Sequence, residues 1–225
     1  MKKIFLFVFI IFSCSPLKKY EETSLKWEKD IKKLESLDKN ENYNKILFIG
    51  SSSIRRWNSI KQDLAPYEPI KRAYGGARYS DLIHFTERLV SPHKVKAICI
   101  FVANDIKGEK NDLSPKEVLN LVKFIVKKIR KSHKNKPIFF IETTPTSKRW
   151  KVWDKISKAN DLIKDFSSLN KNIFYINTRS FYIKSNGMPD DNFFVKDKLH
   201  LNNKGYKLWA KIIKESFDKN LNFKK

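Results

Sequence analysis

The apolar run Ile46–Ile49 (ILFI) ends at Gly50 and is followed by three serines, residues 51–53. A continuous apolar run of this length is typical of a strand buried on both faces, as in a parallel sheet. A serine directly after such a strand would lie in a turn into a helix, where free N–H groups and a partial positive charge gather. Serine-rich turns are also common helix caps. The run therefore predicts a buried strand, and the serines fit a cap as well as a reactive site.

Similar apolar runs recur along the chain and predict four more strands, at residues 70–73, 95–102, 137–141 and 173–176. Patterns with helical spacing of apolar residues surround them, at residues 25–37, 79–90, 114–131, 156–166 and 204–217. Buried strands that alternate with amphipathic helices indicate a parallel sheet covered on both faces. The sequence therefore predicts an α/β protein, a three-layer α/β/α sandwich around a central, mostly parallel five-stranded sheet.

The composition limits the classes of function. The chain has 225 residues, enough for one domain, and its 47 Lys and Arg against 24 Asp and Glu give a net charge of +23. The lysines are spread over the whole chain without a nucleic-acid motif, and heavy use of Lys, Asn, Ile and Phe also fits a genome of low GC content. Two cysteines, Cys14 and Cys99, and four scattered histidines form no metal-ligand spacing. We expect no metal, no cofactor and no nucleic-acid partner.

The first residues have the pattern of an export signal. Lys2 and Lys3 precede the apolar run Ile4–Phe12, which is too short for a membrane span of about 20 residues. Residues 11–14 resemble a bacterial lipoprotein box, which implies cleavage before Cys14 and lipid attachment to its thiol; the alternative is a plain secretory signal with an incidental cysteine. We expect a signal peptide at 1–13, a lipid-attached tether at 14–24, and one domain at 25–225. The protein would then be exported and anchored in the bacterial cell envelope, on the periplasmic side or the cell surface.

Polar residues with catalytic potential follow several predicted strands. In open parallel sheets, ligands bind outside the carboxyl ends of the strands. Gly76 follows the second strand, where a backbone N–H can approach a ligand closely. Asn104 follows the third strand and offers an amide donor for a developing oxyanion. Near the C-terminus, Asp197 precedes His200 by three residues, so the carboxylate can orient the imidazole, which can then deprotonate a serine.

Together these residues resemble the SGNH (GDSL-like) hydrolase family over nearly the whole mature chain. The resemblance implies the flavodoxin-like fold of that family and a Ser-His-Asp triad. Aligning Trp57 with a tryptophan common in the family makes Ser52, rather than Ser51 or Ser53, the nucleophile. Asp197 and His200 would complete the triad. His84 is a less favoured base because it lies within a predicted helix.

The same resemblance implies an oxyanion hole made by the N–H groups of Ser52 and Gly76 and by the side chain of Asn104. One departure concerns Val102, which stands where the family usually has glycine. A β-branched residue does not readily adopt positive φ. Either the loop follows a different path, or the family glycine is not strained.

Residues 145–150 resemble a loop of one bacterial subgroup in which Arg149 and Trp150 border the active site, and residues 27–31 resemble its leading helix. We therefore treat Arg149 and Trp150 as candidate substrate contacts. Trp57, Trp150 and Trp153 can either stack on sugar rings or pack in the core.

The predicted function is a serine ester hydrolase that removes small acyl groups from a carbohydrate or lipid ester. Two alternatives remain. The first is a basic module that binds an acidic polymer or nucleic acid, which the export signal disfavours. The second is a non-catalytic, basic envelope lipoprotein that binds anionic lipid or polymer.

Overall fold

The computed structural model describes residues 16–37 and 43–221 of the chain. The predicted signal peptide at residues 1–13 and the predicted lipidation site Cys14 lie outside the described residues.

The five predicted strands all form, as β1 (Ile46–Gly50), β2 (Pro69–Ala73), β3 (Ala97–Phe101), β4 (Ile138–Ile141) and β5 (Ile173–Ile176). They make one sheet in the order β2-β1-β3-β4-β5, and every neighbouring pair is parallel. Gly50 at the end of β1 is in register with Ala73 of β2 and Phe101 of β3. The residues that follow these three strands therefore meet at one edge of the sheet.

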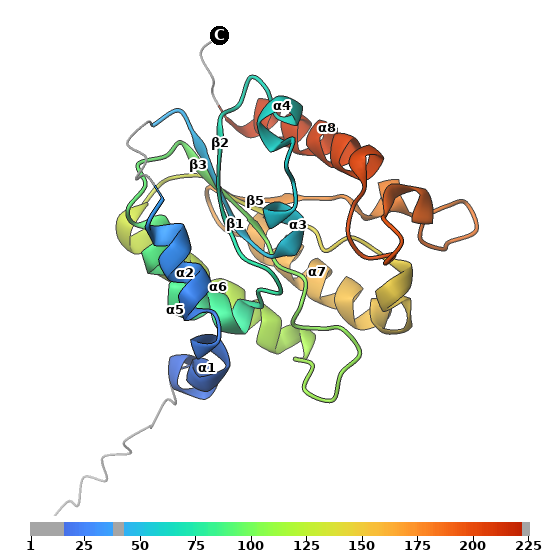
Figure 1. Cartoon of the computed structure of the whole chain (residues 1–225), viewed down its shortest axis with the longest axis horizontal. Helices are drawn as coiled ribbons and strands as arrows, with labels where there is room; N and C mark the ends of the chain where they lie inside the picture. The colour runs from blue at the N-terminus through green and yellow to red at the C-terminus, as the bar shows by residue number, and fades with distance from the viewer. Residues whose placement is uncertain (1–15, 38–42, 222–225) are drawn as a thin grey trace, which may run out of the picture.

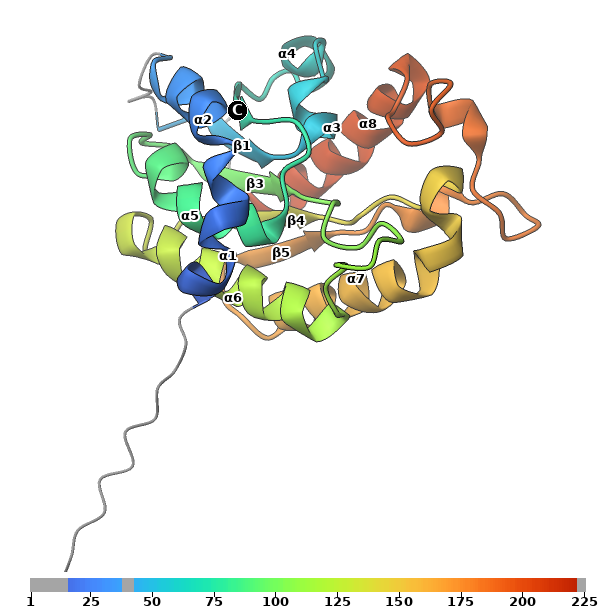
Figure 2. The same ribbon diagram turned by 60° about the horizontal axis from the view of Figure 1, so that its bottom comes forward.

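Helices cover both faces of the sheet (Figures 1 and 2), which confirms the predicted three-layer sandwich. The α-helices are α1 (Pro16–Leu25), α2 (Glu28–Glu35), α3 (Ser52–Arg55), α4 (Ile60–Asp63), α5 (Tyr79–Val90), α6 (Pro115–Ser132), α7 (Trp153–Ser168) and α8 (Asn203–Asn220). Three short 3-10 helices follow β4 or β5: η1 (Ser147–Val152), η2 (Arg179–Tyr182) and η3 (Asp191–Phe193).

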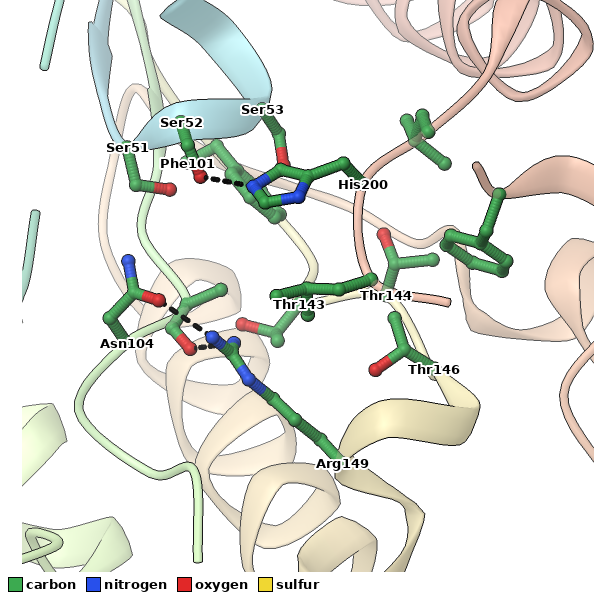
Figure 3. A pocket seen from close by; sticks show the side chains of 14 residues that line it. Ser51, Ser52, Ser53, Phe101, Asn104, Thr143, Thr144, Thr146, Arg149 and His200 are labelled. Carbon is green, nitrogen blue, oxygen red and sulfur yellow. Dashed lines mark hydrogen bonds between the residues drawn. The ribbon is translucent and has the colours of Figure 1, made fainter. Parts of the chain in front are cut away.

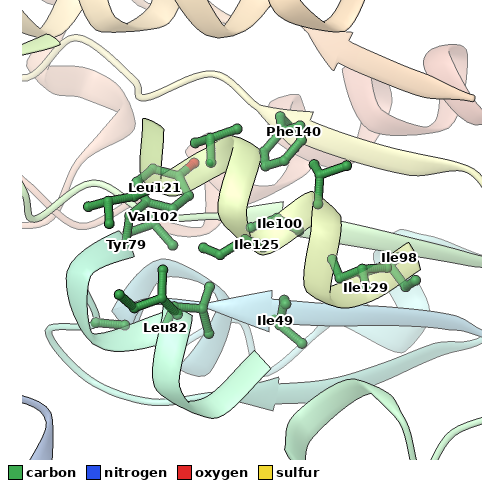
Figure 4. Packing of buried hydrophobic residues seen from close by; sticks show 14 of the residues in the cluster. Ile49, Tyr79, Leu82, Ile98, Ile100, Val102, Leu121, Ile125, Ile129 and Phe140 are labelled. Carbon is green, nitrogen blue, oxygen red and sulfur yellow. The ribbon is translucent and has the colours of Figure 1, made fainter. Parts of the chain in front are cut away.

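Alternating side chains of the strands divide the core into two parts. Ile49 and Ile100 point to the face covered by α5 and α6, where they join Leu82 and Ile125 in one buried cluster (Figure 4). Phe48 points to the other face, into a second cluster with residues of α3, α4 and α8. Both faces of the strands are thus buried, which explains why their sequence is apolar without alternation.

The N-terminal segment differs from its prediction. Residues 14–24 were expected to be a polar tether and residues 25–37 a single helix, but the structure has two helices, α1 and α2, on either side of a turn at Lys26 and Trp27. Leu17 and Tyr20 of α1 pack against the core cluster, and Lys19 pairs with Glu117 of α6 at 2.9 Å. Two apolar residues three apart suffice to attach a mostly polar helix, and a pattern this sparse does not predict a helix from the sequence.

Candidate active site

Ser52 lies at the turn from β1 into α3, as its sequence pattern predicts. Gly50 has a φ of +134°, and a Cβ there would come within 1.9 Å of the carbonyl oxygen of Phe101. Only glycine therefore lets β1 run this close to β3. The N–H of Ser51 then donates to the same carbonyl at 2.9 Å, and α3 begins at Ser52. The glycine and this hydrogen bond place the Ser52 side chain at the carboxyl edge of the sheet.

The side chains of Ser52, His200 and Asp197 form a hydrogen-bonded row. The Ser52 Oγ lies 2.9 Å from Nε2 of His200, and Nδ1 of His200 lies 2.6 Å from Oδ2 of Asp197. An ionised carboxylate only accepts hydrogen bonds, so Nδ1 carries the proton of a neutral imidazole. Nε2 is then the acceptor for the Ser52 hydroxyl (Figure 3). The row has the geometry in which a serine loses its proton to a histidine.

A tight loop between η3 and α8 orients His200. The Asp197 Oδ1 accepts the backbone N–H groups of Leu199 and His200, each at 2.9 Å. Lys198, between Asp197 and Leu199, has a φ of +53°. Burial would raise the pKa of Asp197, but these N–H groups and the His200 ring together hold that pKa below its ordinary value. Asp197 is therefore ionised at neutral pH and keeps the imidazole in one orientation.

Asn104 follows β3 and is fixed by hydrogen bonds on both ends of its amide. Its Oδ1 accepts from Nη2 of Arg149 at 2.6 Å, and its Nδ2 donates to the carbonyl oxygen of Ala77 at 2.8 Å. A guanidinium only donates, so this contact assigns the oxygen and the nitrogen of the amide. The Nδ2 group has a second hydrogen beyond the one that Ala77 accepts. Asn104 thus has an N–H free for an oxyanion.

Arg149 is a buried cation at the same cavity. Its side chain is only 8% exposed, and it also donates through Nη1 to the carbonyl oxygen of Ala103. Within residues 16–37 and 43–221, no carboxylate forms an ion pair with it. Burial lowers the pKa of the guanidinium to about 10, so it stays charged at neutral pH. An unpaired buried cation favours negative charge that develops nearby.

Asp105 holds the neighbouring loop in place. This buried carboxylate accepts the backbone N–H groups of Tyr79 at 2.8 Å and Ser80 at 3.3 Å, at the start of α5. Burial raises its pKa to about 6. Asp105 therefore connects the loop after β3 to the loop after β2, next to Asn104.

One cavity contains Ser52, His200, Asn104 and Arg149 in its lining. The remaining lining residues are Ser51, Ser53, Phe101, Ala103, Thr143, Thr144, Thr146, Phe194, Leu199 and Leu201. The cavity volume is about 20 Å³. The resemblance in residues 145–150 points to the loop after β4, but the sequence does not single out its three threonines. Threonine is common in many loops, so only their shared position on this wall distinguishes them.

Four other residues considered in the sequence analysis do not line this cavity. Gly76 has a φ of +73° and lies beside the Trp27 ring, and it does not line the cavity. Trp150 does not line it either, and its ring stacks on Trp153 with centroids 5.9 Å apart. Trp57 is fully buried and donates through Nε1 to Asp63, so its core interpretation is correct. His84 lies on α5, away from the cavity lining.

The loop after β3 does not need a glycine at the position of Val102. It is buried in the core cluster, and its φ is not positive, because Asn172 and Lys198 are the described residues other than glycine with positive φ. The loop therefore reaches Asn104 without a left-handed residue at this point. Among the described residues no group of His, Cys, Asp and Glu side chains has the arrangement of a metal site. The described helices also include none long and apolar enough to cross a membrane.

No family model and no curated protein matches this sequence. Solved structures match it in fold. A Bacteroides fragilis protein described as an acylhydrolase is 20% identical, with a TM-score of 0.72 over 85% of this chain and 95% of that one. A GDSL-like lipase from Bacteroides thetaiotaomicron is 15% identical, with a TM-score of 0.71 over 87% and 98%. A family 3 carbohydrate esterase from Talaromyces cellulolyticus is 12% identical, with a TM-score of 0.62 over 78% and 96%. The chain therefore has the fold of the GDSL-like, SGNH-type hydrolases, as the sequence motifs predicted.

Proposed function

We propose that this protein is a serine ester hydrolase that removes small acyl groups from a carbohydrate or lipid ester. The observation that carries the proposal is the row Ser52–His200–Asp197, which lies at one cavity with the fixed amide of Asn104. The shared fold with acylhydrolases and carbohydrate esterases supports the same class of reaction.

In the proposed first step, Ser52 Oγ attacks the ester carbonyl carbon while Nε2 of His200 takes its proton. The bond from the carbonyl carbon to the alcohol oxygen then breaks, and His200 returns the proton to the departing alcohol. In the second step water attacks the acyl carbon while His200 takes a proton from it. The bond from the acyl carbon to Ser52 Oγ then breaks, and His200 returns the proton to Oγ. The products are a carboxylic acid and the restored Ser52. Asp197 holds the imidazole and stabilises its charged form.

The negative charge on the carbonyl oxygen is greatest in the tetrahedral intermediates. In our proposal the Ser52 N–H and the second Nδ2 hydrogen of Asn104 bind this oxygen. Arg149 is a positioning residue that holds the Asn104 amide and adds a buried positive charge. The role of the Gly76 N–H stays a prediction from the family resemblance.

A fluorophosphonate probe tests the nucleophile directly. We expect the purified protein to be labelled covalently and to hydrolyse p-nitrophenyl acetate, and Ser52→Ala to abolish both. Ser51→Ala and Ser53→Ala are matched controls, since both serines line the same cavity. Full activity of Ser52→Ala would contradict the assignment. Absence of labelling and turnover in the wild type would favour the non-catalytic alternative that binds anionic lipid or polymer.

We also propose that the protein is exported and anchored through a lipid on Cys14. The support is the charged start, the short apolar run and the lipoprotein-box resemblance of the sequence. We expect Cys14→Ser to move the protein from the membrane fraction to the soluble fraction of bacterial cells and to abolish incorporation of labelled fatty acid. Unchanged membrane retention without fatty acid incorporation would contradict this proposal.

A further inference from the structure

Trp27, at the turn between α1 and α2, contacts the loop between β2 and α5 (residues 74–78) and the first turn of α5. Its Nε1 donates to Oδ2 of the buried Asp81 at 2.9 Å, and the same oxygen accepts the backbone N–H of Arg78 at 3.2 Å. A Cβ at Gly76 would come within 3.2 Å of the Trp27 ring. A side chain of the N-terminal segment therefore supports this loop in its middle and at its end.

The middle of the loop needs such support. Gly75 and Gly76 follow each other and have no side chains to pack, and Gly76 has a φ of +73°. Glycine loses more conformational freedom on folding than other residues, so contacts from outside must hold this backbone. The ring of Trp27 lies against it, with the ring of Tyr74 at a centroid distance of 5.3 Å.

The position of the loop matters to the active site through Ala77. This residue is fully buried, and its carbonyl oxygen accepts from Nδ2 of Asn104 at 2.8 Å. The opposite end of the amide is held by Arg149. Two hydrogen bonds fix the amide plane more firmly than one, and they decide where the second Nδ2 hydrogen points. A shift of the loop would move the Ala77 carbonyl and disorient the proposed oxyanion donor.

Trp27 is itself held by the attachment of α2 to α5 (Figure 2). Ile31 of α2 is fully buried in the core cluster. Arg88 of α5 donates two hydrogen bonds to Glu28 and two to Glu35, at 2.6–2.9 Å. The N-terminal segment is thus fixed on the domain, and Trp27 can act as a rigid support.

We propose that Trp27 is a positioning residue of the active site. It holds residues 74–78 in place, and the Ala77 carbonyl then orients the Asn104 amide towards the oxyanion. The segment before β1 is therefore part of the catalytic unit as well as a cover of the sheet. This inference rests on the proposed ester hydrolase function and adds a residue to it.

The test measures kcat and KM for p-nitrophenyl acetate, with kcat expressed per Ser52 that the fluorophosphonate probe labels, so that unfolded molecules are not counted. We expect Trp27→Leu to lower kcat about 10-fold and to change KM less than about 2-fold, because a misplaced catalytic group slows the chemical step. Trp27→Phe keeps a ring beside Gly76 but cannot donate to Asp81, so we expect a smaller loss of about 3-fold.

Arg88→Met is the matched control. Arg88 lies in the last turn of α5 and Asp81 in the first, so this variant loosens α2 without removing the contacts of Trp27. It should lower the free energy of unfolding in urea and leave kcat unchanged. In the Asn104→Ala background, Trp27→Leu should lower kcat little further, because the group that it positions is absent.

Several outcomes would overturn the role of Trp27. Unchanged kcat in both Trp27 variants would do so, as would a fully additive loss in the Asn104→Ala background or an equal loss in folded Arg88→Met. If Trp27→Leu does not fold, Trp27→Phe in the same backgrounds decides. In each case, hydrolysis that depends on Ser52 keeps the ester hydrolase function. Absence of hydrolysis and of labelling in the wild type would overturn both proposals.

Discussion

Histidines lie at both edges of the sheet, and their hydrogen-bond partners differ. At the carboxyl edge, His200 bonds to the carboxylate of Asp197 and to the hydroxyl of Ser52. At the amino edge, where the chain enters β3 and β4, Nε2 of His133 bonds to the backbone carbonyl of His93 at 2.8 Å. Nδ1 of His133 lies 2.8 Å from the Oγ of Ser132. Burial lowers the pKa of both His93 and His133.

The partners of each imidazole explain the difference. A carboxylate stabilises the imidazolium that forms when His200 takes a proton, so that histidine is prepared for proton transfer. Burial favours the neutral ring of His133 and lowers its pKa, although the hydrogen bond to the His93 carbonyl acts in the opposite direction. His133 therefore serves as a hydrogen-bonding part of the core. His200 thus has the partners that the proposed proton transfer requires, whereas His93 and His133 are buried and bonded to each other.

The largest expected effect is the loss of kcat when His200 is replaced, compared with a replacement of His133. We expect His200→Gln to lower kcat for p-nitrophenyl acetate by about 10⁵-fold or more, with little change in stability. His133→Gln should leave kcat unchanged and lower the free energy of unfolding by about 1–2 kcal/mol. Urea denaturation and steady-state kinetics on both variants measure the two quantities. A loss of kcat in His133→Gln, with the fold retained, would break the comparison.

A smaller effect is expected at the proposed oxyanion donor and its positioning residue. Asn104→Ala should lower kcat about 10²- to 10³-fold with a small change in KM. Arg149→Met should lower kcat by about 10-fold because it releases the Asn104 amide.

The double variant decides whether Arg149 acts through Asn104. The two losses of kcat should not be additive. In the Asn104→Ala background, Arg149→Met should lower kcat little further, which corresponds to a coupling free energy of about 1–2 kcal/mol. Arg149→Lys keeps the charge without the planar fork and separates the two contributions. Fully additive losses of kcat would show that Arg149 acts independently of Asn104.

The smallest expected effect is a dependence of stability on pH at the amino edge. The pKa of His93 falls to about 4 in the folded protein, whereas an unfolded histidine has a pKa of about 6.5. The unfolded chain therefore binds the proton first, and the stabilising contribution of neutral His93 is lost as pH falls from about 6.5 towards 4. The free energy of unfolding should decrease over this range in urea titrations.

The variant His93→Gln should have a weaker dependence than the wild type. Asp105, whose folded pKa is raised to about 6, contributes with the opposite sign, since its stabilising contribution is greatest at low pH and is lost as pH rises. The difference between the two proteins isolates His93. Identical pH profiles would show that His93 does not control acid stability.

Much of the fold was predictable because its signals are local. Runs such as Ile46–Ile49 are apolar without alternation, and this pattern identifies strands that are buried on both faces. The helix predicted at residues 114–131 forms as α6, whose start has a capping box of Ser114 and Glu117. The sequence does not predict α1, because Leu17 and Tyr20 are too few apolar residues to distinguish this helix from a polar linker.

The sequence predicts only those site residues that lie within short motifs. Ser52 and Asn104 stand in short blocks after β1 and β3, which the parallel sheet brings to one edge, and Asp197 and His200 stand in the loop before α8. The contact of Arg149 with Asn104 joins residues 45 positions apart. The buried hydroxyls of Thr144 and Thr146 have no hydrogen-bond partner among the described residues, and no sequence pattern contains that information.

The sequence by itself determined the buried strands, the alternation with helices and the residue types of the proposed triad, because local spacing and hydrophobicity encode them. Tertiary structure alone decided the orientation of the Asn104 amide, the burial of Arg149 and the polarity of the cavity wall. It also gave His200 and His133 different hydrogen-bond partners, and these partners affect how readily each imidazole accepts a proton. Those partners come from distant parts of the chain or from backbone atoms, and only the folded chain brings them within 3 Å of each other.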